Sequence, residues 1–219
     1  MTNNTENIFH KKGKLIIVEG IDGAGKTDAC QIIKKILKKY KIKNTMIREP
    51  GGTPLSEKLR NIIKNYNPYE IINTKTILLL MYAARMQVIQ NIIKPALNNS
   101  IWIISDRYDL SSFAYQGGGY NISQDIIMIL SKIVVQSYIP DLTIYLDIIP
   151  KHALQRINLR GKLDNIEKNN LLFFERTRNV YLKYIKKNKN SFTVNANLKI
   201  DIVHKEIKNK LKKWLKNAK

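Results

Sequence analysis

A glycine-rich segment near the amino terminus has the residue types and spacing that bind phosphate. Residues 20–27 read G-I-D-G-A-G-K-T, which fits the pattern G-x-x-x-x-G-K-[ST] directly after an apolar run. In this pattern, backbone N–H groups and the start of the following helix surround phosphate oxygens. Lys26 would neutralise the β- and γ-phosphates of a nucleotide, and the Thr27 hydroxyl can reach Mg²⁺. The segment therefore predicts a nucleotide-binding P-loop made of Gly20, Ile21, Asp22, Gly23, Ala24, Gly25, Lys26 and Thr27.

A Mg²⁺ ion at such a loop commonly has a carboxylate beside it, and two apolar runs of this chain end in aspartate. Asp106 follows I-W-I-I-S, and Asp147 follows T-I-Y-L. Asp106 is followed at once by Arg107, which would place a carboxylate and a guanidinium together at the end of one strand. We therefore favour Asp106, with Thr27, as the metal-binding pair, and Asp147 is the alternative.

Arginine is rare in this chain, and its positions indicate a second anion site. Only eight of the 38 basic residues are arginine, and the rest are lysine. Arginine differs from lysine in its planar fork, which can hold two oxygens of a phosphate at once. Arg48 and Arg107 lie at the ends of predicted strands, and Arg85 lies in an otherwise apolar helical segment. Together they predict that a second phosphate binds near the P-loop.

Apolar runs alternate with helix-length segments, and this alternation predicts the fold class. Strands are expected at residues 14–19, 45–48, 101–105, 142–146 and 191–195. Helices are expected at residues 26–40, 54–65, 74–97, 123–137, 150–160, 165–187 and 199–217. The pattern is typical of an α/β protein with a parallel five-stranded sheet flanked by helices. No linker divides the chain, so we expect a flexible tail at residues 1–12 and one domain at residues 13–219.

Composition excludes several classes of protein. The chain is 44% hydrophobic and 25% charged, which is typical of a folded globular protein. One cysteine and three scattered histidines rule out a disulfide framework and a cysteine-clustered metal site. The net charge is +21, but the lysines are spread along the chain, so no specific nucleic-acid partner is expected. No uninterrupted apolar run reaches the roughly 18 residues of a membrane span, and the polar start lacks a secretory signal, so a cytoplasmic protein is expected.

Four further motifs follow the P-loop along the chain: R-E-P-G-G-T at 48–53, A-A-R at 83–85, D-R-Y at 106–108 and A-Y-Q-G-G-G at 114–119. With the P-loop, they resemble the thymidylate kinase family in its bacterial form. The resemblance implies a three-layer P-loop kinase fold with a helical lid at about residues 150–165. It also implies a homodimer that transfers the γ-phosphoryl group of ATP to dTMP in dTTP biosynthesis, giving dTDP and ADP with Mg²⁺.

The resemblance also implies roles for individual residues. Arg85 and Arg107 would bind the dTMP phosphate, and a cis peptide bond before Pro50 would direct its neighbours toward the cleft. Met81 stands where relatives usually carry a phenylalanine that stacks on thymine. Tyr115 would lie near the sugar. The implied substrate-binding residues are Arg48, Glu49, Pro50, Met81, Arg85, Arg107, Ser112, Tyr115 and Gln116.

The lid would supply positive charge during phosphoryl transfer. Residues 156–164 read R-I-N-L-R-G-K-L-D, which resembles the mobile lid of the bacterial form. Asp22 stands in the P-loop where other family members carry an arginine, which agrees with a charge supplied from the lid. We expect Arg160 to be this residue, and Arg156 is the second candidate. The expected catalytic set is Lys26, Asp106, Arg107, Arg156 and Arg160.

Two other functions would use the same P-loop. One is another nucleoside-monophosphate or deoxynucleoside kinase of the same fold, and a nucleoside acceptor would need a base such as Glu19. The other is a basic P-loop ATPase that acts on nucleic acid. The second alternative is disfavoured, because neither the basic nor the aromatic residues concentrate in one stretch of the chain.

Overall fold

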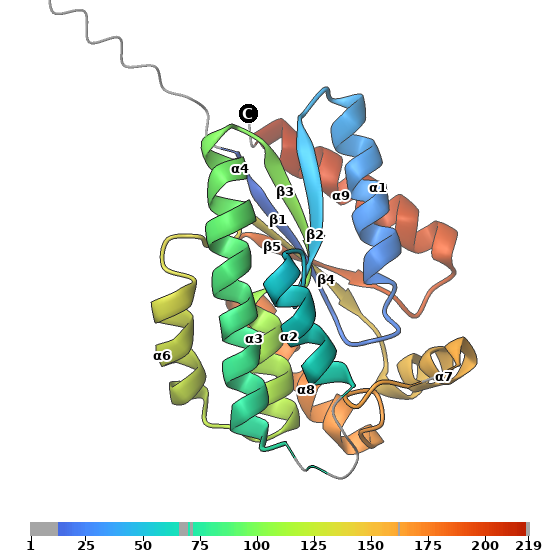
Figure 1. The fold of residues 1–219 in the computed structure, drawn as a ribbon. Coiled ribbons are helices and arrows are strands. Elements are labelled where there is room, and N and C mark those ends of the chain that lie inside the picture. Colours follow the sequence, from blue (N-terminus) through green and yellow to red (C-terminus); the bar gives the residue numbers. More distant parts are fainter. Residues whose placement is uncertain (1–12, 66–69, 71, 162, 218–219) are drawn as a thin grey trace, which may run out of the picture.

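The computed structural model describes residues 13–65, 70, 72–161 and 163–217. Within these residues, all five expected strands form one parallel sheet with the order β2-β3-β1-β4-β5 (Figure 1). The predicted fold class is therefore confirmed. The tail expected at residues 1–12 lies outside the described residues. The strands are β1 (Leu15–Glu19), β2 (Asn44–Arg48), β3 (Trp102–Asp106), β4 (Leu142–Asp147) and β5 (Ser191–Asn195).

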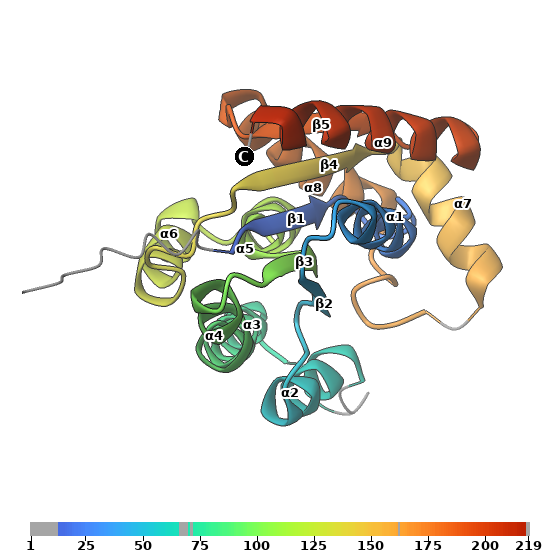
Figure 2. The same ribbon diagram turned by 90° about the horizontal axis from the view of Figure 1, so that it is seen from above.

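Helices cover both faces of the sheet, because the central strand is apolar on both sides (Figure 2). Ile16 and Val18 pack with apolar residues of α1 and α9, whereas Leu15 and Ile17 pack with those of α3 and α6. The helices are α1 (Lys26–Lys39), α2 (Pro54–Lys64), α3 (Thr74–Val88), α4 (Lys94–Asn98), α5 (Asp109–Ser112), α6 (Gln124–Val134), α7 (Pro150–Arg160), α8 (Leu171–Lys187) and α9 (Ile200–Asn217), with two π-helical segments, η1 (Ile89–Ile93) and η2 (Phe113–Gly119).

The longest helical segment belongs to the core. Thr74–Asn98, which joins α3, η1 and α4, is long and apolar enough to cross a membrane by length and composition alone. Its side chains Leu78, Tyr82 and Ile93 are buried in the cluster that packs under β1 and β3. Packing inside the protein therefore accounts for the apolar side chains on the inner face of this segment, whereas Leu79 and Met86 are exposed.

Residues 109–119 form helical structure that the sequence analysis did not anticipate. This segment, α5 followed by η2, ends in three glycines that disfavour a helix. Gly118 and Gly119 are needed because α8 packs directly on them: a Cβ at Gly118 would lie 2.8 Å from the Arg176 carbonyl, and one at Gly119 would overlap the Phe173 ring. Tertiary packing therefore overrides local propensity here.

The helix expected at residues 165–187 begins later than predicted, at Leu171. Asp164 Oδ1 accepts the backbone N–H groups of Ile166 and Glu167, which holds residues 164–167 in a turn. The Asn170 side chain then accepts the N–H of Phe173 and caps the helix. Local side-chain hydrogen bonds therefore set this helix start.

Candidate active site

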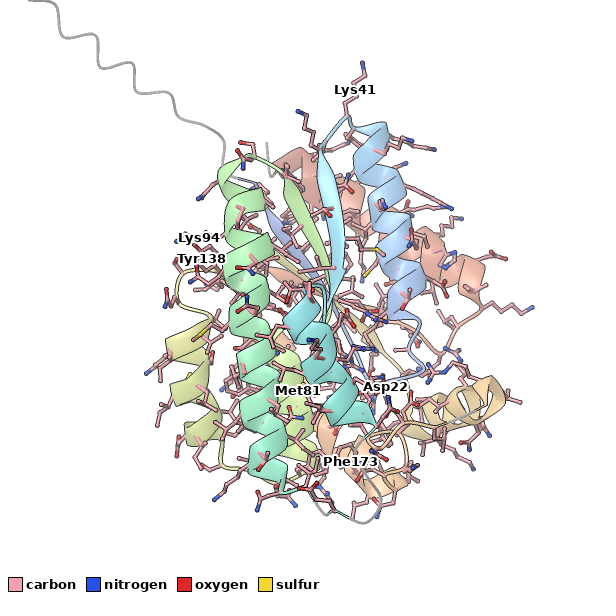
Figure 3. The ribbon with its side chains drawn as sticks, viewed as in Figure 1. Asp22, Lys41, Met81, Lys94, Tyr138 and Phe173 are labelled. Atoms are coloured by element: carbon pink, nitrogen blue, oxygen red, sulfur yellow. The ribbon has the colours of Figure 1, made fainter. Side chains whose placement is uncertain are left out.

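A cavity of about 490 Å³ lies at the carboxyl ends of β1, β2 and β3. Asp22 of the P-loop and Met81 of α3 both line it and are labelled in Figure 3. Of the predicted site residues, only Gly20, Ile21 and Ala24 do not line the cavity. The structure thus brings together Asp22, Gly23, Gly25, Lys26, Thr27, Arg48, Glu49, Pro50, Met81, Arg85, Asp106, Arg107, Ser112, Tyr115, Gln116, Arg156 and Arg160.

The P-loop runs from the end of β1 into the start of α1. Gly23 and Gly25 have φ values of 80° and 86°, a backbone conformation that glycine adopts without steric cost. Lys26, the first residue of α1, is buried, and its Nζ donates to the Ile21 carbonyl at 3.0 Å. Burial lowers the pKa of Lys26 from its ordinary value. The loop therefore holds one desolvated cation at its centre.

The two predicted metal-binding residues are in direct contact. Thr27 Oγ1 donates to Asp106 Oδ2 at 2.9 Å across the gap between α1 and β3. The alternative, Asp147, is paired with Arg178, whose Nε and NH2 lie 2.7 and 2.9 Å from the two carboxylate oxygens. Within the described residues, no group of three or more His, Cys, Asp or Glu side chains could hold a metal. One hydroxyl and one carboxylate fit Mg²⁺, which often keeps water and phosphate oxygens as its other ligands.

Arg107 is the most densely bonded cation of the site. Its φ of 74° is left-handed, which is uncommon for a residue with a side chain. Its NH2 lies 2.6 Å from Asp22 Oδ1 and 2.9 Å from the Tyr115 hydroxyl, which also donates to Asp22 at 2.8 Å. Burial acts to raise the pKa of Asp22, but the charges of Arg107 and Lys26 outweigh it and lower that pKa. In the protein without substrates, Asp22 therefore partly neutralises Arg107.

Arg85 is buried between two carboxylates. Its Nε donates to Glu49 Oε2 at 2.7 Å, and its NH1 lies 3.1 Å from Ser112 Oγ and 3.4 Å from Asp109 Oδ1. Its NH2 donates to the Tyr108 carbonyl at 3.0 Å. Burial raises the pKa of Glu49 to about 7, although Arg85 acts in the opposite direction. Four of the five N–H groups of Arg85 are therefore already occupied by protein acceptors.

The segment around Pro50 has the expected backbone. The Glu49–Pro50 peptide bond is cis, as the resemblance implied. Arg60 of α2 donates to the Pro50 carbonyl at 2.7 Å, and Arg48 pairs with Glu57 at 3.2 Å, where both side chains are exposed. Within the described part of the chain, the Arg48 side chain is therefore held by a surface ion pair alone, which a phosphate could displace.

The two candidate lid arginines have different partners. Arg156 NH1 donates to the Gly23 carbonyl of the P-loop at 3.3 Å. Arg160 instead pairs with Glu167, a buried carboxylate of the turn before α8. Asp164 also lies 2.5 Å from Lys64 of α2, so the residues after α7 reach across the cavity mouth. The structure brings Arg156, rather than the expected first candidate Arg160, into contact with the P-loop.

Several residues of the site were missed by sequence reasoning. Glu167 lies just beyond the expected lid, and Tyr181 of α8 lies beside Arg107, with its hydroxyl 3.4 Å from NH1. Neither has a local sequence signal, because each meets the site only through packing. Glu19 did have a sequence signal, because it is a charged residue at the end of a buried strand. The sequence analysis considered it only as a catalytic base.

A second cavity, of about 370 Å³, adjoins the first, and Gly23, Gly25, Asp28 and Arg156 line both. It is bounded by the P-loop, Arg156 of α7, and the segment that leads from β5 into α9. Apart from the P-loop and Arg156, none of its lining had been predicted. Its apolar side chains come from Ala29, Ala196, Leu198, Ile200, Val203 and Ile207.

A parallel α/β sheet with a P-loop after its central strand, and a cation-lined acceptor cleft beside that loop, defines the class of P-loop nucleotide kinases. The comparisons with known proteins narrow this class. The family model described as "Thymidylate kinase" matches residues 18–207. The chain belongs to the thymidylate kinase family.

Similar proteins from three organisms agree with this membership. The "Thymidylate kinase" of Buchnera aphidicola subsp. Schizaphis graminum is 51% identical over 205 residues, covering 93% of this chain and 97% of the relative. That of Buchnera aphidicola subsp. Acyrthosiphon pisum is 50% identical over 206 residues, with the same coverage. The "Thymidylate kinase" of Wigglesworthia glossinidia brevipalpis is 42% identical and covers 94% of this chain and 98% of the relative.

Proposed function

We propose that this chain is an ATP-dependent thymidylate kinase that converts dTMP and ATP into dTDP and ADP. The observation that supports the proposal most strongly is that one cavity contains both the P-loop lysine, Lys26, and a second group of cations that includes Arg107. Two phosphate-bearing substrates need two such cation groups, and they need them close enough for in-line transfer. Family membership supplies the acceptor, because the relatives are thymidylate kinases.

On this proposal, ATP binds at the P-loop. Lys26 and the backbone N–H groups of the loop would hold its phosphates, and the apolar second cavity would receive its base. Thr27 and Asp106 would hold Mg²⁺, which would neutralise phosphate charge when bound.

The dTMP phosphate would bind to Arg107 and Arg48. Arg107 lines the cavity, and Arg48 is only weakly paired, so both can exchange a carboxylate partner for a phosphate. Arg85 was also expected to bind the phosphate, but Glu49 and Asp109 balance its charge, which gives that role less support.

The nucleoside part of dTMP would occupy the remainder of the cleft. Two buried polar atoms there, Glu49 Oε1 and Gln116 Nε2, lack a hydrogen-bond partner among the described residues. Such atoms are costly when left unpaired, so they favour a polar ligand. With Pro50, Met81, Ser112 and Tyr115, they form the proposed base and sugar site.

The lid would complete the site during transfer. Arg156 already touches the P-loop, and Arg160 could join it by leaving Glu167. Positive charge placed on the transferring group lowers the barrier of phosphoryl transfer, and a closed lid excludes water that would hydrolyse ATP. Either arginine can therefore supply the charge expected from the lid.

A coupled assay of ADP release with Mg²⁺ and ATP tests the proposal. The acceptors compared are dTMP, dUMP, thymidine, dGMP and CMP, and we expect dTMP to give the highest kcat/KM. Faster turnover of another acceptor would replace the proposal with the related kinase activity. Glu19 argues against a nucleoside acceptor, because this carboxylate is fully buried and does not line the cavity. ATP hydrolysis that depends on DNA or RNA would indicate the nucleic-acid alternative.

Replacing Met81 with phenylalanine should strengthen dTMP binding. A thioether gives a ring less defined contact than another ring does, and an aromatic pair adds about 0.5–1.5 kcal/mol. We expect the KM for dTMP to fall by about two- to tenfold, with the KM for ATP unchanged. Met86→Phe is the matched control, because Met86 lies on the same helix but does not line the cavity. An unaltered KM for dTMP would show that Met81 does not contact the base.

We also propose that the enzyme is a cytoplasmic homodimer with a single domain at residues 13–219. Exposed apolar side chains gather on the neighbouring helices α3 and α6: Leu79, Met86, Ile126, Met128, Ile129 and Ile133. Exposed apolar side chains on two neighbouring helices favour contact with another protein surface, here a second copy. Light scattering should give about twice the mass of 25.4 kDa for one chain, and Ile129→Asp should reduce it to one. A wild-type mass of one chain would refute the dimer.

A further inference from the structure

Behind Arg107 lies a buried hydrogen-bond network that the proposed reaction does not use directly. Glu19, at the end of β1, is 0% exposed and lines neither cavity. Its Oε1 accepts the backbone N–H groups of Tyr108 at 2.9 Å and Ser111 at 3.2 Å. Its Oε2 accepts the hydroxyls of Ser111 at 2.6 Å and Tyr181 at 2.9 Å. A carboxylate with four donors and no access to substrate is suited to holding other groups in place.

The backbone bonds of Glu19 hold the turn that contains Arg107. Tyr108 is the N-cap residue of α5 and Ser111 lies within this short helix, which follows the left-handed backbone of Arg107. Glu19 accepts the backbone N–H groups of both residues. The Arg107 N–H donates to the Val18 carbonyl at 2.9 Å, and the Arg107 carbonyl accepts Ser105 Oγ at 2.7 Å. Since a left-handed arginine persists only where its surroundings hold it, these bonds set the backbone of Arg107.

The hydroxyls connect Glu19 to the guanidinium. Each hydroxyl has one proton, and Ser111 and Tyr181 can each direct it at Glu19. Their oxygens are then free to accept from Arg107 NH1, which lies 3.1 Å from Ser111 Oγ and 3.4 Å from the Tyr181 hydroxyl. All of these hydrogen bonds therefore point the same way: Arg107 donates to the two hydroxyls, and both hydroxyls donate to Glu19. Each bond polarises the next.

These hydrogen bonds hold the NH1 end of the Arg107 guanidinium and leave its Nε–NH2 edge to bind a ligand. NH1 is taken by Ser111, Tyr181 and the Gly20 carbonyl. NH2 contacts Asp22 and Tyr115, and no hydrogen bond from Nε is found among the described residues. The Nε–NH2 edge is the one that binds two oxygens of an oxyanion side by side, as Arg178 shows with Asp147.

We propose that Glu19, Ser111 and Tyr181 are positioning residues that hold the NH1 end of Arg107, so that its Nε–NH2 edge receives the acceptor phosphate. The proposal rests on the proposed function, because that function makes Arg107 a phosphate-binding residue. Tyr181 is itself fixed by α8, with its ring stacked on Tyr145 at 5.2 Å and edge-on to Tyr115 at 6.5 Å. Removing its hydroxyl therefore leaves the packing in place.

The test compares Tyr181→Phe with Tyr184→Phe. Tyr184 lies on the same helix, and its hydroxyl donates to Gln124 at 3.1 Å, outside the cavity. For Tyr181→Phe, we expect kcat/KM for dTMP to fall about tenfold, mostly through KM, and calorimetric dTMP affinity to fall with it. The KM for ATP should stay within about twofold of wild type. Tyr184→Phe should change none of these values. A merely structural effect would lower the active fraction and thus kcat, but not the dTMP affinity of the folded enzyme.

Glu19→Gln extends the test. The amide would donate toward the hydroxyls and reverse their direction, so that donors would oppose each other at Arg107 NH1. We expect a larger loss of dTMP affinity than for Tyr181→Phe, in protein whose folding is checked by thermal melting.

The results separate the two proposals. Wild-type enzyme that does not phosphorylate dTMP would overturn the proposed function, and the same variants would then be compared by their affinity for inorganic phosphate. Tyr181→Phe with the phosphate or dTMP affinity of wild type would overturn the positioning role, even if the wild-type enzyme is active.

Discussion

Lys26→Ala is expected to lower kcat for dTMP phosphorylation by about 10³-fold or more, which is the scale on which single cations act in phosphoryl transfer. Lys26 is buried at the centre of the P-loop, where its Nζ is 3.0 Å from the Ile21 carbonyl and 3.7 Å from Asp22. In this desolvated position, its charge interacts with phosphate far more strongly than it would in water. Stopped-time assays at saturating ATP and dTMP measure the effect.

Lys34→Ala is the matched control for this prediction. Lys34 lies on α1 as well, but its side chain is exposed. We expect wild-type kcat for this variant and similar melting temperatures for both, since alanine suits a helix. If Lys26→Ala retained more than about a tenth of wild-type kcat, the P-loop would not be the catalytic donor site.

Arg107→Ala is expected to lower kcat/KM for dTMP by about 10²- to 10³-fold, with a much smaller change in the KM for ATP. Arg107 is the cation that five groups hold in place: Gly20, Asp22, Ser111, Tyr115 and Tyr181. Arg107→Lys should remain nearly as impaired, because an ammonium cannot bind two phosphate oxygens side by side. Initial rates at varied dTMP and fixed saturating ATP measure the effect.

Arg178→Ala separates loss of a phosphate ligand from loss of an ion pair. Arg178 also forms a two-point contact with an aspartate, but outside the cavity. Both alanine variants should melt below wild type, because each leaves a carboxylate without its partner. Only Arg107→Ala should lose dTMP affinity, and equal losses in the two variants would contradict the assignment of Arg107.

Much of the fold could be predicted because its signals are local. The apolar run that became β1 is buried on both faces, and the glycines of the P-loop need positive φ whatever surrounds them. Segment 109–119 could not be predicted in this way, because its last two glycines are explained by contact with Phe173 and Arg176, more than fifty residues away. Strand periodicity and turn preferences depend on a few neighbouring residues. The packing of one helix against another depends on residues that are far apart in the sequence.

By itself, the sequence determined the P-loop, the positions of the five strands and most of the residues that line the main cavity. Only the tertiary structure decided how their charges are shared. It paired Arg85 with Glu49, Arg160 with Glu167, and Asp147 with Arg178, and it placed Tyr181 beside Glu19, 162 residues earlier in the chain. Electrostatic and hydrogen-bond energies depend on distances of a few ångströms and on burial, and both are set only when distant segments pack together.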